Sequence, residues 1–309
     1  MIKPQPGVQV ALADLLALRA NVRQLKLASR GRVLATRTGG HLSRFRGRGM
    51  EFDESRVYQA GDDPRNMDWR VTARAGVPHI KLFREERERP IWVFVDQGAN
   101  MRFGTRRAFK SVVAAQAAAL IAWRAIDDAD RVGCFVFNEH HAFYQRPAAR
   151  SRGLMPLLNA LTSLNERATS AGYASPDAAA RELVKLVRPG SLVFLFSDFT
   201  DCAVDTSSWL GPMVWHSEVV MVDVVDPIEI NPPPAGQYPV TDGTRTLVLD
   251  FAQRGLREAY LKRYQQHCER MADFSRRFGV HRLTLRTDDN IVSALATRLH
   301  SRATSSRTR

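Results

Sequence analysis

The 309-residue chain carries 45 Lys or Arg against 32 Asp or Glu, which gives a formal charge of +13 and a pI near 10.3. Its apolar fraction of 44% is ordinary for a globular protein. No run reaches the roughly 20 apolar residues of a membrane span, and the first residues lack a secretory-signal pattern. Cys134, Cys202 and Cys268 are too far apart for a zinc site and too few for a disulfide framework, so we expect a cytoplasmic protein.

The positive charge is concentrated at the N-terminus. Residues 1–50 hold ten Lys or Arg and one acid, Asp14. A basic arm of this kind can bind nucleic acid, an anionic membrane surface or an acidic protein. Nucleic-acid binding is the alternative function that this arm suggests, although no aromatic-interleaved or helix-turn-helix pattern accompanies the charge.

Apolar residues recur at helical spacing from Val10 to Leu27, which predicts an amphipathic helix. Residues 31–49 are rich in Gly and Arg and are expected to form a loop. Further on, Asp63 precedes Pro64, a pair typical of a helix start. The segment 80–83 alternates like a short strand.

The segment between Gly47 and Arg74 is dense in charges of alternating sign. One interpretation is a network of ion pairs that clamps the segment to the rest of the fold. The other is a recognition surface for a protein partner. The candidate partner-binding residues are Glu51, Arg56, Asp62, Asp63, Arg65, Asp68, Trp69 and Arg74.

From Pro90 onward, strand and helix patterns alternate. An apolar strand over 91–95 ends at Asp96, and another over 192–197 ends at Asp198. Ligands of open α/β sheets bind beyond the carboxyl ends of the strands, so we expect the two acids to converge on one crevice. The segment 226–239 is too rich in proline to be regular. The other expected elements are helices over 107–127, 154–164, 176–187, 256–278 and 290–299, strands over 131–137, 141–145, 218–224 and 281–286, and a small hairpin over 241–250.

With these residues in place, two resemblances emerge. The order strand–Asp–loop–helix, hairpin, strand–Ser-Asp resembles a von Willebrand factor A fold. The run Gly61-Asp-Asp-Pro-Arg-Asn-Met-Asp-Trp-Arg70, with Ser197-Asp198-Phe199 and Asp226-Pro-Ile-Glu229, is similar to the signature of the domain-of-unknown-function 58 family. The resemblance covers about residues 44–286. It implies a bacterial cytoplasmic protein without enzymatic activity, whose relatives are usually paired with MoxR-type AAA+ ATPases as adaptors in chaperone-like maturation of client proteins.

The von Willebrand factor A fold normally carries a metal-ion-dependent adhesion site, Asp-x-Ser-x-Ser with a Thr and a later Asp. By this resemblance the predicted ligands of a Mg²⁺ site are Asp96, Asn100, Ser175 and Asp198. The site is degenerate, because Gly98 lacks the hydroxyl expected at its position and Asn100 offers an amide oxygen in place of one. A metal-free remnant, in which Asp96 orders its own loop, stays open.

The sequence therefore predicts three parts: a basic extension over 1–89, a von Willebrand factor A-like α/β domain over 90–302, and a basic tail over 303–309. The predicted function is a non-enzymatic protein–protein adaptor, with no catalytic residue assigned. A metal-dependent hydrolase built on Asp96 and Asp198 is a third, lesser interpretation.

Overall fold

The chain divides into two compact units in the computed structural model. The sheet unit comprises Met1–Val33 and Arg89–Arg309, and the small unit comprises Leu34–Glu88. The predicted extension over 1–89 is thus shared between the two, and the predicted boundary at residue 303 falls inside the last helix. The structure describes residues 7–25, 27, 50–59, 61–85, 88–162, 170–173, 175–200, 206–241 and 246–305.

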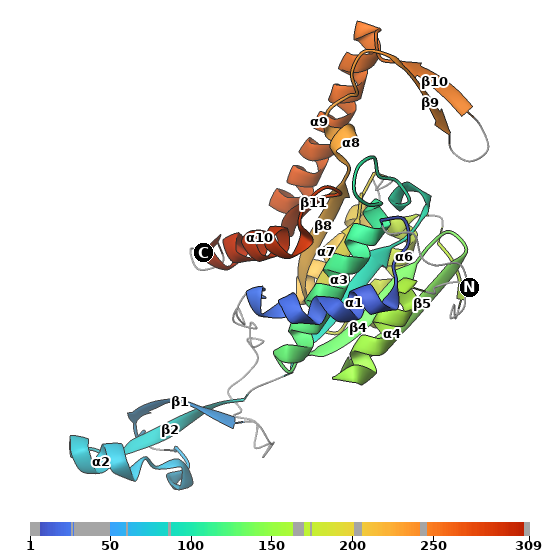
Figure 1. Ribbon diagram of the computed structural model, residues 1–309. Helices are drawn as coiled ribbons and strands as arrows, with labels where there is room; N and C mark the ends of the chain where they lie inside the picture. Colours follow the sequence, from blue (N-terminus) through green and yellow to red (C-terminus); the bar gives the residue numbers. More distant parts are fainter. Residues whose placement is uncertain are drawn as a thin grey trace. The chain divides into compact units, whose positions relative to one another are not determined.

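The described part of the sheet unit is built on a seven-stranded sheet in the order β11-β8-β7-β3-β4-β5-β6 (Figure 1). The five strands from β11 to β4 run parallel, and β5 and β6 add antiparallel at one edge. This confirms the predicted α/β architecture with a mostly parallel sheet. The strands are β3 (Pro90–Asp96), β4 (Arg131–Phe137), β5 (His141–Ala149), β6 (Ser170–Ala171), β7 (Leu192–Ser197), β8 (Glu218–Val225) and β11 (His281–Arg286).

Helices cover both faces of the sheet. Side chains of β3 alternate between the two cores, with Val93 in one and Trp92 and Phe94 in the other. Strands buried on both faces read as continuous apolar runs, which is why β3 and β7 were evident in the sequence. The first core is closed by α1 (Leu12–Ala17), the 3₁₀ helix η1 (Leu18–Gln24), α3 (Lys110–Asp127), α4 (Ser151–Thr162) and α10 (Ile291–Ser305); the second by α6 (Pro176–Leu186), α7 (Thr206–His216) and α9 (Arg254–Phe278).

The N-terminal helical segment belongs to the core of the sheet unit. Leu15, Val22 and Leu25 are fully buried in the first core, and the indole of Trp123 in α3 donates to the carbonyl of Leu15 at 3.0 Å. The helix predicted over 10–27 is therefore present, but its second half winds as a 3₁₀ helix.

The small unit pairs β1 (Met50–Val57) with β2 (His79–Glu85) in antiparallel register. Between them lie the 3₁₀ turn η2 (Pro64–Asn66) and the helix α2 (Trp69–Ala75). The helix start predicted at Asp63 and Pro64 is present with its cap, but it opens only the short 3₁₀ turn η2. Helix α2 begins after Asp68, whose carboxylate accepts from the amides of Arg70 and Val71.

Two regions differ from the sequence prediction. Helix α7 was missed because Pro212 lies inside it, a signal that argues against a helix. The proline-rich segment holds a short helix, α8 (Pro227–Ile230), and the strand β9 (Gln237–Thr241), which pairs with β10 (Thr246–Asp250) as the predicted hairpin. No helix in the described ranges is both long and apolar enough to cross a membrane.

Candidate functional site

The carboxyl ends of β3 and β7 open on one crevice. The two strands are parallel neighbours, with Val95 opposite Phe196, so Asp96 and Asp198 emerge at the same edge. Strand β3 leads to α3 on one face of the sheet, whereas β7 leads to α7 on the other (Figure 1). The crevice between them is the topological switch point at which α/β folds bind ligands.

Asp96 lies buried at the end of β3. Its Oδ1 accepts from the amide of Gly98 and its Oδ2 from the hydroxyl of Ser197, both at 2.8 Å. Burial raises the pKa of Asp96 to about 6, against the opposing effect of these two hydrogen bonds. A Cβ on Gly98 would lie 3.0 Å from Asp96 Oδ1, which shows how tightly the loop closes on the carboxylate.

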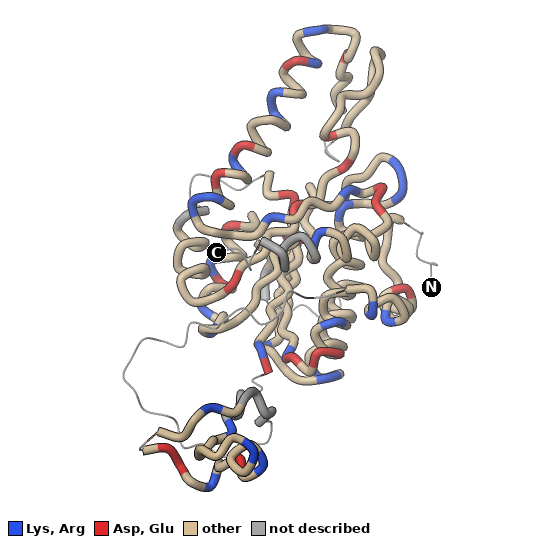
Figure 2. Tube along the Cα trace, turned by 90° about the vertical axis from the view of Figure 1, so that its left-hand side faces the viewer, with Lys and Arg blue, Asp and Glu red and all other residues tan. Residues whose placement is uncertain are grey.

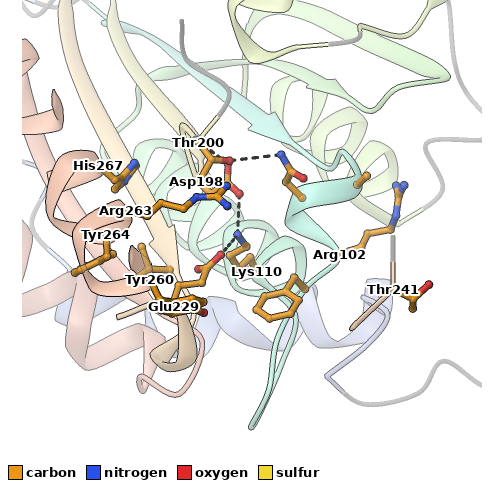
Figure 3. Close-up of a pocket in the computed structure, with 14 residues that line it drawn as sticks. Arg102, Lys110, Asp198, Thr200, Glu229, Thr241, Tyr260, Arg263, Tyr264 and His267 are labelled. Atoms are coloured by element: carbon orange, nitrogen blue, oxygen red, sulfur yellow. Dashed lines mark hydrogen bonds and ion pairs between the residues drawn. The ribbon is translucent and has the colours of Figure 1, made fainter. Parts of the chain in front are cut away.

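Asp198 is paired with a lysine that sequence reasoning missed. Lys110 opens α3, is 1% exposed, and places its Nζ 2.7 Å from Asp198 Oδ2 and 2.7 Å from Glu229 Oε1 (Figure 3). Burial alone would lower the pKa of Lys110, but the charges of Asp198 and Glu229 raise it above its ordinary value. Burial alone would likewise raise the pKa of Asp198, and Lys110 instead holds it low.

A capping box positions Glu229 for this contact. The Asp226 carboxylate accepts from the amide of Ile228, and the Glu229 carboxylate accepts from the amide of Asp226 at 2.7 Å. Hydroxyls of Thr105 and Thr287 also donate to Asp226. The Asp226-Pro-Ile-Glu229 motif is therefore the scaffold that aims a carboxylate at Lys110.

The turn after Asp198 is strained. Phe199 is buried and has a φ of +49°, a left-handed conformation that a bulky side chain rarely adopts. The next residue, Thr200, donates through both its amide and its hydroxyl to Asp198 Oδ1. Such strain persists only where the surroundings over-determine the backbone, and here it lies directly after Asp198, which pairs with Lys110.

Two cavities share the crevice. The larger, of about 670 Å³, is lined by Lys110, Asp198, Glu229 and the exposed Arg263 of α9. A smaller one, of about 110 Å³, lies beside it. The predicted metal ligands are divided between them: Asp96 and Ser175 line the smaller cavity, Asp198 the larger, and Asn100 both.

The four predicted ligands do not fit a Mg²⁺ shell as they are arranged. Mg²⁺ demands near-octahedral oxygens. Asp198 Oδ2 instead faces the Lys110 ammonium, Ser175 Oγ accepts from the amide of Ala178 to cap α6, and Asn100 turns its amide nitrogen towards a hydroxyl. Among the described residues, no group of three or more His, Cys, Asp or Glu is placed to hold a metal ion.

A second buried cluster adjoins the larger cavity. Asp223 of β8 accepts from Arg282 of β11 at 2.7 Å and lies 3.3 Å from His267 Nε2. His267 lines the cavity, and its Nδ1 has no hydrogen-bond partner among the residues that the structure describes. These contacts tie α9 to the sheet. Sequence reasoning missed the cluster because Asp223 lies within an apolar strand pattern.

The candidate residues of the small unit separate into two groups. The acids are structural: Asp62 pairs with Arg56 at 2.7 Å, Asp63 caps η2, and Asp68 caps α2 while accepting from the Ser55 hydroxyl. Trp69, Arg65 and Arg74 are exposed instead. The side chain of Glu51 lies outside the described residues. Of the described acids only Asp62 forms an ion pair, and its partner Arg56 lies in the same unit, whereas Asp63 and Asp68 cap helical turns. A clamp to the rest of the fold stays a prediction, and the recognition interpretation keeps Trp69, Arg65 and Arg74.

The chain belongs to the family described as protein of unknown function DUF58, whose sequence profile matches residues 54–270. The predicted family membership is thereby confirmed. The uncharacterized protein Mb1516 of Mycobacterium bovis is 30% identical over 275 residues, which cover 88% of this chain and 85% of that protein. The uncharacterized proteins MT1527 and Rv1480 of Mycobacterium tuberculosis match to the same extent.

Two solved structures also match, with low similarity. The conserved hypothetical protein BatB from Bacteroides thetaiotaomicron is 15% identical, with a TM-score of 0.38 over 70% of this chain and 99% of that one. An uncharacterized membrane spanning protein from Vibrio fischeri is 14% identical, with a TM-score of 0.18 over 68% of this chain and 96% of that one. TM-scores this low carry no argument about fold or function.

Proposed function

We propose that this chain is a cytoplasmic, non-enzymatic adaptor that binds a MoxR-type AAA+ ATPase and client proteins in chaperone-like maturation. The observation that carries the proposal is the exposed Trp69, which opens α2 with 71% of its surface accessible. Arg65, Arg70 and Arg74 are exposed beside it in the sequence, and none has an ion-pair partner among the described residues. Tryptophan and arginine are the residue types that dominate protein–protein binding energy.

The support beneath Trp69 is rigid. Asp68 receives three hydrogen bonds, from the Ser55 hydroxyl and the amides of Arg70 and Val71, and its own amide donates to the carbonyl of His79. A backbone that is already held in place at its anchor residue loses little conformational freedom on binding. Blue and red segments both occur along the tube of the small unit (Figure 2), and the exposed Arg65, Arg70 and Arg74 favour an acidic partner surface.

The crevice chemistry supports a binding role over a hydrolytic one. A metal-dependent hydrolase would need Asp96 and Asp198 free to hold a metal ion. Asp198 is instead paired with Lys110, and both oxygens of Asp96 accept hydrogen bonds from the protein. We assign the sheet to the von Willebrand factor A-like type as part of the same proposal, because an acid ends each of two adjacent parallel strands.

The nucleic-acid alternative rests on charge alone. Residues 1–6, 26 and 28–49 of the arm that suggested it lie outside the described residues. Steep salt dependence of DNA or RNA binding, lost on deleting residues 1–46, would favour that alternative.

The test is a binding titration between the purified full-length chain and the MoxR-type ATPase of the same organism. Trp69→Ala should weaken binding by about 30-fold, the equivalent of about 2 kcal/mol for a central aromatic anchor. Trp215→Ala is the matched control, because Trp215 on α7 is 90% exposed and lies in the other unit. No binding by the unmodified chain, or equal loss in both variants, would contradict the proposal.

A further inference from the structure

We propose that Lys110 is the resident cation of the crevice, and that its ammonium occupies the position in which a divalent metal ion would otherwise neutralise Asp198. In this arrangement Asp198 needs no bound metal ion to neutralise its charge. This inference is independent of the adaptor role, whose test lies at Trp69 in the other unit.

The surroundings of the Lys110 ammonium are those of a bound cation. Two carboxylate oxygens lie 2.7 Å from Nζ, and the Phe103 ring centroid lies 5.8 Å away. An ammonium has three N–H donors, so two are used by Asp198 and Glu229 and the aromatic face lies within cation–π range. The side chains of Lys110 and Asp198 are 2% and 4% exposed and that of Glu229 is 28% exposed, so the Lys110–Asp198 pair is the one shielded from water.

The two carboxylates are held by contacts other than the one with Lys110. Thr200 donates to Asp198 through its amide and its hydroxyl, and the capping box of α8 holds Glu229. Lys110 itself stands at the N-terminus of α3, where the helix dipole disfavours a positive charge. The two carboxylates therefore stabilise the buried ammonium at that position. A metal ion that bound there would have to displace the ammonium and deprive Lys110 of both carboxylate partners.

The sequence suggests a different reason for weak metal binding, namely the hydroxyl that is missing at Gly98. The two explanations make opposite predictions. If the hydroxyl is the obstacle, Gly98→Ser should restore a site. If Lys110 is the obstacle, Gly98→Ser should change nothing and removing the ammonium should create a site from Asp198 and Glu229.

The experiment measures Mn²⁺ binding to the full-length chain by electron paramagnetic resonance. We expect no saturable binding by the unmodified chain or by Gly98→Ser. We expect Lys110→Met, which keeps an unbranched apolar stem, to gain saturable binding that an added Asp198→Asn removes. Saturable binding by the unmodified chain or by Gly98→Ser that Asp198→Asn abolishes would overturn the proposal, and so would a folded Lys110→Met that binds no Mn²⁺.

A second measurement covers the case in which Lys110→Met does not fold. In the unmodified chain, nitrogen-15 NMR of the lysine ammonium groups should show one slowly exchanging signal, because a buried and doubly paired ammonium is protected from water. That signal should disappear in Lys110→Arg and should not move when Mg²⁺ is added. Its absence from the unmodified chain, or a saturable shift on addition of Mg²⁺, would refute the assignment.

Discussion

Lys110 balances the negative charge of the crevice. Its ammonium lies between Asp198 and Glu229, so removing it leaves two carboxylates facing each other without compensation. Breaking a buried ion pair by removing one partner is far more destabilising than replacing the whole group.

Lys110→Met should therefore lower the free energy of unfolding by about 3–5 kcal/mol at neutral pH. Adding Asp198→Asn and Glu229→Gln to Lys110→Met should recover most of this loss, because no uncompensated charge remains. Urea unfolding of the single and triple variants measures both quantities. A triple variant no more stable than the single one would show that packing, not charge, causes the loss.

The raised pKa of Asp96 predicts that its contribution to folding stability falls as the pH rises, whereas the contribution of an ion-paired acid grows. Its pKa in the folded chain is about 6, against an ordinary value of 3.8. Its contribution to stability is complete below about pH 4 and is lost as the pH rises through 6, because the folded chain must then ionise a buried group. The difference corresponds to about 3 kcal/mol at neutral pH.

Asp96→Asn should accordingly raise stability at pH 7 and leave it nearly unchanged at pH 4. Urea unfolding at the two pH values measures the effect. Asp273→Asn, on the exposed surface of α9, is the control and should change neither value. A variant that is less stable than the unmodified chain at pH 7 would mean that the hydrogen bonds of Asp96 outweigh its burial.

At the scale of elements, two helical glycines differ in how much space surrounds the position that a Cβ would occupy. A Cβ on Gly153, near the start of α4, would lie 2.2 Å from the carbonyl oxygen of Ala148 and 2.5 Å from that of Val132. These are backbone atoms, which cannot move aside cheaply. Gly255, near the start of α9, has nothing within 4 Å of the same position.

Gly153→Ala should therefore destabilise the chain by about 1–3 kcal/mol, and Gly255→Ala should stabilise it by about 0.5–1 kcal/mol. Thermal unfolding of the two variants gives the comparison, with each serving as the other's control. Similar shifts of the same sign in both would contradict the close packing of α4 on β4 and β5.

Other elements show where local patterns fail. The strand patterns of β3, β7 and β8 were predictable because parallel strands covered on both faces require long apolar runs. Helix α7 was not, because Pro212 gives the local signal of a break while packing on the second core stabilises the helix. The start of α2 was displaced because Asp68, not Asp63, caps a full helix.

At the scale of the whole molecule, both described cores draw their residues from the sheet unit alone. The first includes Leu15, Val22 and Leu25, which precede the small unit in the chain. The N-terminal helical segment therefore contributes to the stability of the sheet unit even though residues 34–88 separate it from the rest.

Replacing residues 34–88 by a flexible Gly/Ser linker of equal length should leave the melting temperature of the sheet unit nearly unchanged. Deleting residues 1–88 should lower it markedly, because α3 then exposes the apolar surface that α1 and η1 cover. Calorimetry of both forms tests this. Equal melting temperatures would show that the N-terminal segment adds nothing to the core.

The sequence by itself determined the family, the α/β architecture and the two strand-end acids, Asp96 and Asp198. Apolar periodicity and short motifs are local signals, and strand ends follow directly from them. Only the tertiary structure decided what neutralises Asp198. Lys110 lies 88 residues from Asp198 and 119 from Glu229, and the three meet only because α3 packs on the sheet and α8 is capped beside it. A contact between side chains so distant in the chain is set by packing and leaves no periodic trace in the sequence.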